Sequence, residues 1–100
     1  ISHHRMAIKL NSEYADAYYN LGDALISEQK TEEAISLYRK AIKLKPEYAE
    51  AYYNLGNVLM SEQKTEEAIS LYRKAIKLKP GFVAAQKNLE TVLRRSEELQ

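Results

Sequence analysis

Three asparagine side chains recur at a fixed spacing along this sequence of 100 residues. Asn20, Asn54 and Asn88 stand 34 residues apart. A primary amide carries hydrogen-bond donors and acceptors, so a row of amides at one spacing can pair with successive backbone groups of an extended peptide, whatever its sequence. The row therefore predicts a peptide-binding surface. The alternative is that asparagine merely suits this position, through local capping or solubility.

Other residue types offer little chemistry. His3 and His4 are the only imidazoles, and adjacent helix positions point about 100° apart, so they cannot chelate one metal ion from one helix face. Cysteine is absent, which excludes a disulfide framework and cysteine-based metal sites. We therefore expect no catalysis, no cofactor and no metal site. His4 is interpreted either as a worn repeat position or as a remnant of an expression tag.

The asparagine spacing belongs to a larger repeat. The stretch SEQKTEEAISLYRKAIKLKP occupies residues 27–46 and again 61–80, and residues 13–46 differ from 47–80 only at positions 16/50, 23/57, 24/58 and 26/60. A fixed period of this length indicates an array of supersecondary units that bury their apolar faces against one another. The same register makes residues 1–12 the second helix of a preceding partial unit, and residues 81–100 the first helix of a third unit that acts as a cap. The chain is interpreted as a fragment.

Composition limits the possible partners. The chain has 15 basic and 14 acidic residues, for a net charge of +1, which gives no case for a nucleic-acid surface. No apolar run reaches the roughly 18 residues of a membrane span, so no membrane insertion is expected. Neither the compartment nor the ligand is identifiable from the sequence.

The apolar residues of one unit predict two amphipathic helices, because they recur at intervals of three and four. The positions are Ala49, Tyr52, Leu55, Gly56 and Leu59 in the first helix, and Ala68, Ile69, Leu71, Tyr72, Ala75, Ile76 and Leu78 in the second. Gly22 and Gly56 are expected where paired helices approach closely. Pro46 and Pro80 are expected in the first turn of the following helix, and Thr65 is expected to cap the second helix.

These positions together resemble the tetratricopeptide repeat. The residues that carry the resemblance are Tyr18 and Tyr52, Leu21-Gly22 and Leu55-Gly56, Ala34 and Ala68, Tyr38 and Tyr72, Ala41 and Ala75, and Pro46 and Pro80. The sequence departs from the family pattern where Leu25 and Leu59 replace a tyrosine, Gln29 and Gln63 replace a glycine, and Ser12 replaces a proline. The glutamines make the turn between the two helices harder to predict.

The resemblance implies an all-α, right-handed solenoid of antiparallel helix pairs, with complete units at 13–46 and 47–80. It also implies a concave groove, lined by the first helix of each unit, that holds an extended peptide or a partner helix. The groove residues it implies are Asp16, Tyr19, Asn20, Asp23, Ile26 and Ser27; Glu50, Tyr53, Asn54, Asn57, Met60 and Ser61; and Ala84, Lys87, Asn88, Thr91, Arg94 and Arg95. Three of the four differing pairs, all but Ala24/Val58, fall on this groove.

The tyrosines divide into two groups. Tyr19 and Tyr53 would stand beside the asparagines as aromatic anchors for a ligand. The alternative is that they are partly buried between neighbouring first helices. The other group is expected in the core and consists of Tyr18, Tyr38, Tyr52 and Tyr72.

Charge along the groove is graded and could orient a ligand. The acidic residues Asp16, Asp23 and Glu50 lie toward one end, and the basic residues Lys87, Arg94 and Arg95 toward the other. Family members that clamp a terminal carboxylate use basic residues and asparagines at set positions. Only Asn54 matches that set, whereas Tyr19, Asp23, Ala84 and Asn88 do not, so a carboxylate clamp is not expected.

The sequence thus predicts a protein-interaction module that binds a protein or peptide ligand. One alternative is a structural spacer, or a segment that self-associates through an open N-terminal half-unit. A further alternative is that near-identical units reflect engineering or recent duplication, without a specific ligand.

Overall fold

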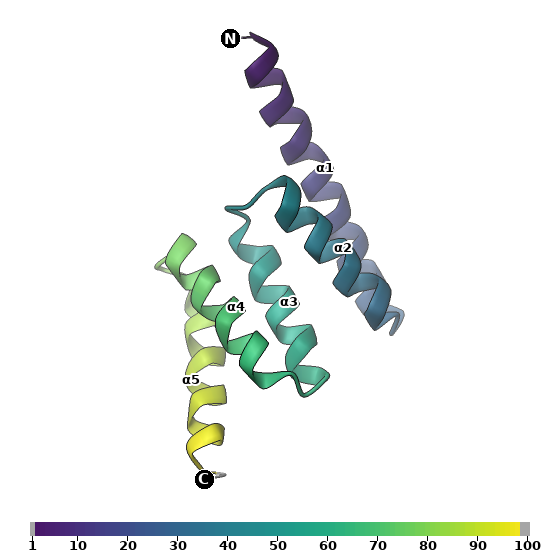
Figure 1. Ribbon diagram of the computed structural model, residues 1–100. Coiled ribbons are helices and arrows are strands. Elements are labelled where there is room, and N and C mark those ends of the chain that lie inside the picture. The colour runs from purple at the N-terminus through teal and green to yellow at the C-terminus, as the bar shows by residue number, and fades with distance from the viewer. Residues whose placement is uncertain (1, 99–100) are drawn as a thin grey trace.

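Five helices make up the part of the chain that the structure describes (Figure 1). This computed structural model describes residues 2–98, apart from the side chains of residues 2–5, 7, 8 and 98. The helices are α1 (Ser2–Ser27), α2 (Thr31–Leu44), α3 (Ala49–Ser61), α4 (Thr65–Leu78) and α5 (Val83–Glu98), and no strand occurs in this range. Consecutive helices pack side by side, which confirms the predicted all-α solenoid.

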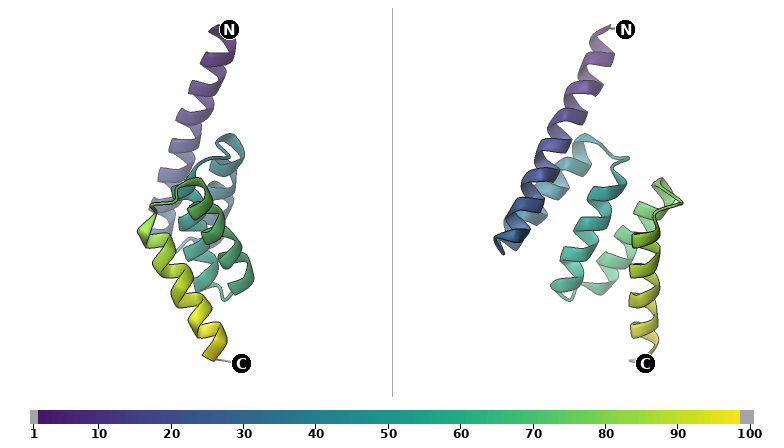
Figure 2. Two further views of the ribbon diagram at one scale, coloured as in Figure 1. Left: turned by 90° about the vertical axis from the view of Figure 1, so that its left-hand side faces the viewer. Right: turned by 180° about the vertical axis from the view of Figure 1, so that it is seen from behind.

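The first helix differs from the expectation that residues 1–12 form a separate second helix of a preceding unit. Residues 2–27 instead form one uninterrupted helix, whose N-terminal half projects beyond α2 (Figures 1 and 2). At the corresponding place between α2 and α3, the chain turns around Pro46. Ser12 stands at that position in α1 and keeps its backbone N–H, so nothing in the local sequence forces the helix to end.

The turns between paired helices contain a glutamine at the position where the family pattern has a glycine. Gln29 and Gln63 adopt φ of 64° and 63°, the left-handed conformation usually given to glycine. In the first turn, Lys30 N–H donates to Leu25 O at 2.8 Å, and Gln29 N–H donates to Ile26 O at 3.0 Å. These two bonds define a Schellman motif, which satisfies carbonyls at the end of α1. A glutamine can therefore make the same turn, at the cost of a strained backbone.

Two local expectations about helix starts are wrong. Pro46 and Pro80 lie in the turns before α3 and α5, not in the first helical turn. Thr65 is the first residue of α4, and the residue at the cap position, Lys64, makes no side-chain cap hydrogen bond.

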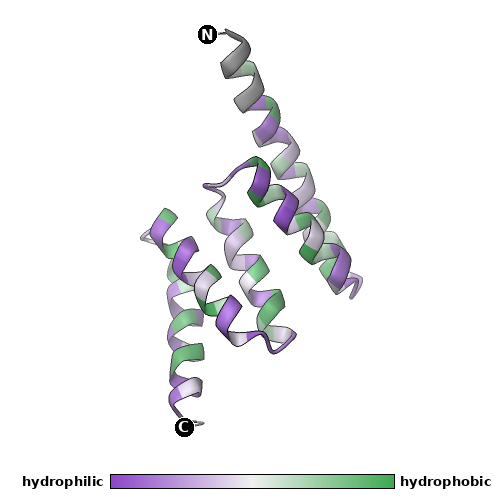
Figure 3. Ribbon diagram, viewed as in Figure 1, coloured by the Kyte–Doolittle hydropathy of each residue, from purple (hydrophilic) through white to green (hydrophobic). Residues whose placement is uncertain are grey.

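The core follows the small and aromatic positions of the repeat. Hydrophobic and hydrophilic residues are interspersed along each helix (Figure 3). Tyr38 and Tyr72 are almost fully buried, as expected, and a Cβ built on Gly22 would lie 2.8 Å from the Tyr38 ring. The matching distance from Gly56 to the Tyr72 ring is 2.9 Å. Glycine therefore stands where the first helix of each pair touches the tyrosine of the second.

Candidate groove between the first helices

Two clusters of polar side chains join the first helix of one unit to the first helix of the next. The first polar cluster consists of Tyr19, Asp23, Tyr38 and Asn54, and the second consists of Tyr53, Asn57, Tyr72 and Asn88. Each member of the second lies 34 residues after its counterpart in the first. The clusters are therefore the same device, used at both junctions between units.

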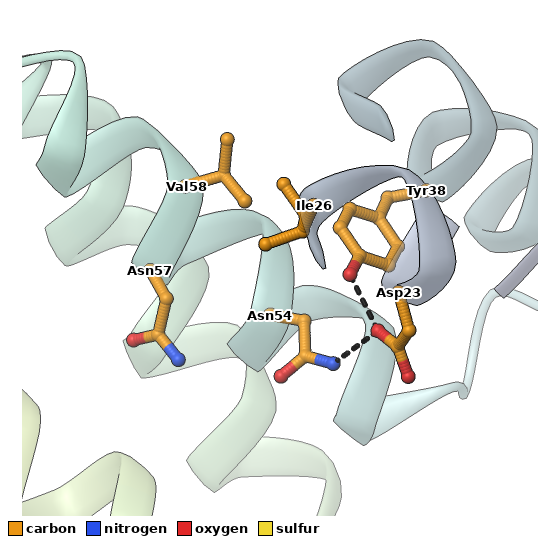
Figure 4. A pocket seen from close by; sticks show the side chains of 6 residues that line it. All are labelled: Asp23, Ile26, Tyr38, Asn54, Asn57 and Val58. Carbon is orange, nitrogen blue, oxygen red and sulfur yellow. Dashed lines mark hydrogen bonds between the residues drawn. The ribbon is translucent and has the colours of Figure 1, made fainter. Parts of the chain in front are cut away.

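In the first polar cluster, Asp23 on α1 accepts two hydrogen bonds at one oxygen. Its Oδ1 accepts from the Tyr38 hydroxyl at 2.5 Å and from Asn54 Nδ2 at 3.0 Å (Figure 4). Asn54 Nδ2 also donates to the Tyr19 hydroxyl at 2.9 Å. Both amide hydrogens of Asn54 are thus used within the chain, and only its Oδ1 is left to meet a ligand.

The second polar cluster repeats this geometry with an amide in place of the carboxylate. Asn57 Oδ1 accepts from the Tyr72 hydroxyl at 2.6 Å and from Asn88 Nδ2 at 2.8 Å. Asn88 Nδ2 also donates to the Tyr53 hydroxyl at 3.3 Å. Aspartate and asparagine are therefore interchangeable as the inner acceptor, but they present different outer atoms: a carboxylate oxygen at position 23 and an NH2 group at position 57.

Tyr19 and Tyr53 fill the space between the units. The Tyr19 ring centroid lies 4.9 Å from that of Tyr48, and the Tyr53 centroid lies 4.9 Å from that of Phe82. These are packing distances for aromatic pairs, and both tyrosines are partly buried. The contacts are those of the alternative in which these residues are buried between first helices.

Three tyrosine hydroxyls of the clusters, those of Tyr19, Tyr38 and Tyr72, have a raised pKa. Burial raises the pKa of Tyr38 well above its usual value, and the hydrogen bond to the Asp23 carboxylate and the charge of Asp23 raise it further. Burial also raises the pKa of Tyr19, followed by the charges of Asp23 and Glu50. Burial raises the pKa of Tyr72 in the second polar cluster. Both clusters therefore keep hydroxyl donors at neutral pH.

A hollow of about 250 Å³ opens beside the first polar cluster (Figure 4). It is lined by Asp23, Ile26, Tyr38, Asn54, Asn57 and Val58. Among the described hydrogen bonds, none uses the outer oxygen of Asp23, the Asn54 Oδ1 or the Asn57 Nδ2, and none of these atoms is a buried, unsatisfied group. The hollow thus offers solvent-accessible donors and acceptors beside the apolar side chains of Ile26 and Val58.

Comparison with known proteins gives this architecture a family. A family model described as "TPR repeat" matches residues 22–63, and one described as "Tetratricopeptide repeat" matches residues 49–82. The chain belongs to the tetratricopeptide-repeat family. Proteins of this family serve in general as interaction scaffolds and not as catalysts.

Two solved structures resemble the tetratricopeptide array over 87% of the chain. "Crystal structure of MamA" superposes with a TM-score of 0.82 at 36% identity, and "Crystal structure of MamA protein" with a TM-score of 0.78 at 37% identity. The match covers 50% of the first neighbour and 48% of the second, so the chain spans about half the length of these structures. The comparison with curated proteins yielded no match.

Six of the predicted groove residues lie in the two polar clusters: Tyr19, Asp23, Asn54, Tyr53, Asn57 and Asn88. Asn54 and Asn88 donate their amide hydrogens to side chains of the preceding unit, so these donors are not free to bind a ligand. Asn20 is exposed on α1 and takes part in none of the described hydrogen bonds. Lys87 is exposed on α5, in none of the described ion pairs.

Sequence reasoning missed two residues of the hollow. The sequence predicts only a core role for Tyr38, yet its hydroxyl donates to Asp23 and it lines the hollow. The sequence predicts Val58 outside the groove, yet it lines the hollow together with Ile26. The signal for Val58 was present, because it is one of the four positions at which the two units differ.

Two of the charged residues in the predicted gradient form ion pairs within the chain. Glu50 forms an ion pair with Lys79 at 3.3 Å, and Arg94 with Glu90 at 2.8 Å, both at exposed sites. No described ion pair involves Asp23, so no cation of the described residues pairs with its carboxylate. Exposed ion pairs contribute little to stability.

The described residues include neither a metal-binding cluster nor a membrane-spanning helix. No group of three or more histidine, cysteine, aspartate or glutamate side chains is placed to hold a metal ion. None of the described helices has the length and apolar character to cross a membrane.

Proposed function

We propose that the hollow beside the first polar cluster binds a side chain of an extended peptide, and that this side chain is basic. The carrying observation is the outer oxygen of Asp23, which none of the described hydrogen bonds uses and which lies beside Ile26 and Val58. A lysine or arginine side chain combines an apolar stem with a cationic head, so it complements both features. The peptide would run along α1, α3 and α5, with its basic part near Asp23.

The asparagines take a smaller part in this proposal than their sequence pattern suggested. Since both hydrogens of Asn54 are used within the chain, this amide can only accept a hydrogen bond from the peptide backbone. The NH2 group of Asn57 and the side chain of Asn20 supply the donors. The proposed recognition is therefore asymmetric between the two units, acidic at position 23 and neutral at position 57.

The repeat itself provides a substitution that tests the site without disturbing the fold. Asp23→Asn keeps the inner oxygen that accepts from Tyr38 and Asn54, because Asn57 does the same in the second unit. Glu32→Gln is the matched control, since it removes one negative charge at an exposed position of α2. Both variants should unfold at nearly the temperature of the parent chain.

The experiment is a peptide-library selection against the parent chain, followed by affinity measurements by fluorescence anisotropy. We expect enrichment of peptides with a conserved basic residue, and a loss of roughly tenfold in affinity for Asp23→Asn, as for the removal of one exposed charge-assisted hydrogen bond. Glu32→Gln should bind like the parent. Equal affinity of Asp23→Asn and Glu32→Gln would show that the hollow is not the binding site. No enrichment by the parent would leave a structural spacer as the better description.

The spacer alternative has its own observation in favour. The amide donors of Asn54 and Asn88 bridge consecutive first helices, so the recurring asparagine also serves the stability of the array. Peptide binding separates the two functions, because either one loses stability when Asn54 is removed, whereas a spacer shows no peptide preference that depends on position 23.

A further inference from the structure

One face of α1 carries large apolar side chains that nothing covers in the described structure. Tyr14 is 58% exposed and Leu21 50% exposed, whereas the equivalent residues of the next unit, Tyr48 and Leu55, are 8% and 1% exposed. Ala17 is exposed as well, and its counterpart in α3 is fully buried. The positions are those that the array normally buries against a neighbouring helix, so the face of α1 has the composition of an interface.

This face continues onto the projecting half of α1. Leu10 is exposed there, four residues before Tyr14, and the helix continues straight through both (Figure 1). Leu10, Tyr14, Ala17 and Leu21 are spaced by four, three and four residues, which is the spacing of the a and d positions of a coiled-coil seam. We call these four residues the α1 seam.

The α1 seam is complementary to a second copy of itself that runs in the opposite direction. If two copies of α1 run antiparallel with Leu10 facing Leu21, then Tyr14 faces Ala17, and the twofold axis repeats both pairs. Each layer then matches two leucines or one large and one small residue, as close packing requires. At the flanks Glu13 comes opposite Asn20, and Asn11 opposite Tyr18, so no like charges meet.

A hollow beside the α1 seam provides room for the partner. It has a volume of about 440 Å³ and is lined by Leu21, Leu25, Glu33, Ser36, Leu37 and Lys40. The hollow lies between α1 and α2. Its lining includes Leu21, the residue that would face Leu10 of the second copy. An apolar side chain entering there would cover Leu21, Leu25 and Leu37 together.

We propose that two copies of this chain dimerise by antiparallel pairing of their α1 seams, with Leu10 of each copy against Leu21 of the other. The occupant of the exposed face is thus a second copy and not an unrelated helix, because the seam matches itself in one register. Such an interface is isologous, with each patch used by both copies. The interface has only four layers of side chains and is therefore small, so we expect a dissociation constant on the order of 10 µM. The proposal is independent of peptide binding in the groove.

The first test is sedimentation equilibrium over a concentration series. The parent chain should pass from monomer to dimer, and Leu21→Glu should stay monomeric, because it would bury an unpaired carboxylate against Leu10 of the other copy in two layers. The control is Val83→Glu, since Val83 is 55% exposed on α5, away from the α1 seam. Circular dichroism should show equal helicity for all three. A monomeric parent, or dimerisation of Leu21→Glu equal to that of Val83→Glu, would overturn the proposal.

The second test determines direction and register. The chain has no cysteine, so Leu10→Cys and Leu21→Cys each introduce a single thiol. In the antiparallel register the two thiols of a mixed dimer face each other, whereas identical thiols lie 11 residues apart along the helix, roughly 16 Å, beyond disulfide reach. A mixture in a glutathione redox buffer should therefore form mostly mixed disulfides. Predominant disulfides between identical variants would indicate a parallel pair and refute the register.

Neither test depends on the groove. Leu21 does not line the hollow beside the first polar cluster, so Leu21→Glu should bind peptide like the parent chain. Failure of dimerisation with intact peptide binding would remove this inference alone. Failure of peptide binding in a chain that still dimerises would remove the proposed function alone.

Discussion

Asn54 links two units with one nitrogen. Its Nδ2 donates to Tyr19 and to Asp23, whereas Asn20 takes part in none of the described hydrogen bonds. Removing a partner from a half-buried network costs about 1–3 kcal/mol, and an exposed substitution changes stability by less than about 0.5 kcal/mol. We therefore expect Asn54→Ala to lower the free energy of unfolding in urea titrations by about 1–3 kcal/mol, and Asn20→Ala to leave it unchanged. Equal effects of the two would mean that the network adds nothing to stability.

Tyrosines within the two polar clusters and outside them make the stability of the fold sensitive to alkaline pH. Burial raises the pKa of Tyr19, Tyr38, Tyr48, Tyr52 and Tyr72 above the ordinary value of 10.0. The folded state therefore holds protons that the unfolded state releases near pH 10, and the stabilisation is complete below pH 10 and lost as the pH rises above it. We expect the free energy of unfolding to fall above about pH 10. Tyrosinate absorbance at 295 nm should develop at higher pH in the native chain than in urea, and coincident curves would contradict this.

At the scale of the helices, the contact between glycine and tyrosine sets the spacing of each pair. A methyl group on Gly22 or Gly56 would meet the Tyr38 or Tyr72 ring at less than 3.0 Å, and neither ring can move without loosening its hydrogen bond. Alanine favours helix by up to about 1 kcal/mol, but overpacking a filled core costs roughly 1–3 kcal/mol. We expect Gly22→Ala and Gly56→Ala to lower the melting temperature.

Gly81→Ala is the control for this contact. Nothing lies within 4 Å of a Cβ built at Gly81, so the substitution should be nearly neutral. A melting temperature that rises in Gly22→Ala would show that helix propensity outweighs the contact with Tyr38.

The helices could largely be predicted because their signals are local and repeated. Apolar spacing located the helices that became α2 to α5, and the family pattern identified the pairing. The uninterrupted α1 is harder to predict from the sequence, because Ser12 replaces the proline and the remaining residues allow either a turn or a helix. The groove was predicted by position but not by bonding. The partners of Asn54 lie 31 and 35 residues away, and only folding shows that Asp23 and Tyr19 take both amide hydrogens.

At the scale of the whole molecule, the protection of backbone amides from hydrogen exchange should be highest in α3 and should decrease toward both ends of the array. This helix packs on α2 on one side and on α4 on the other, and it buries Leu55, Val58 and Leu59. In an array, each unit is stabilised by its neighbours, so segments with neighbours on one side open more easily. We expect native-state hydrogen exchange to be slowest in α3 and fastest in the projecting residues 2–12 of α1.

The proposed dimer adds a concentration dependence to this gradient. Pairing of the α1 seams would cover residues 10–21, so amide exchange in this segment should slow as the parent chain is concentrated, because binding stabilises only the folded form. Exchange in Leu21→Glu should not respond to concentration. If residues 2–12 of Leu21→Glu exchanged as slowly as α3, α1 would be stabilised by something other than its neighbours, and the array description of this chain would fail.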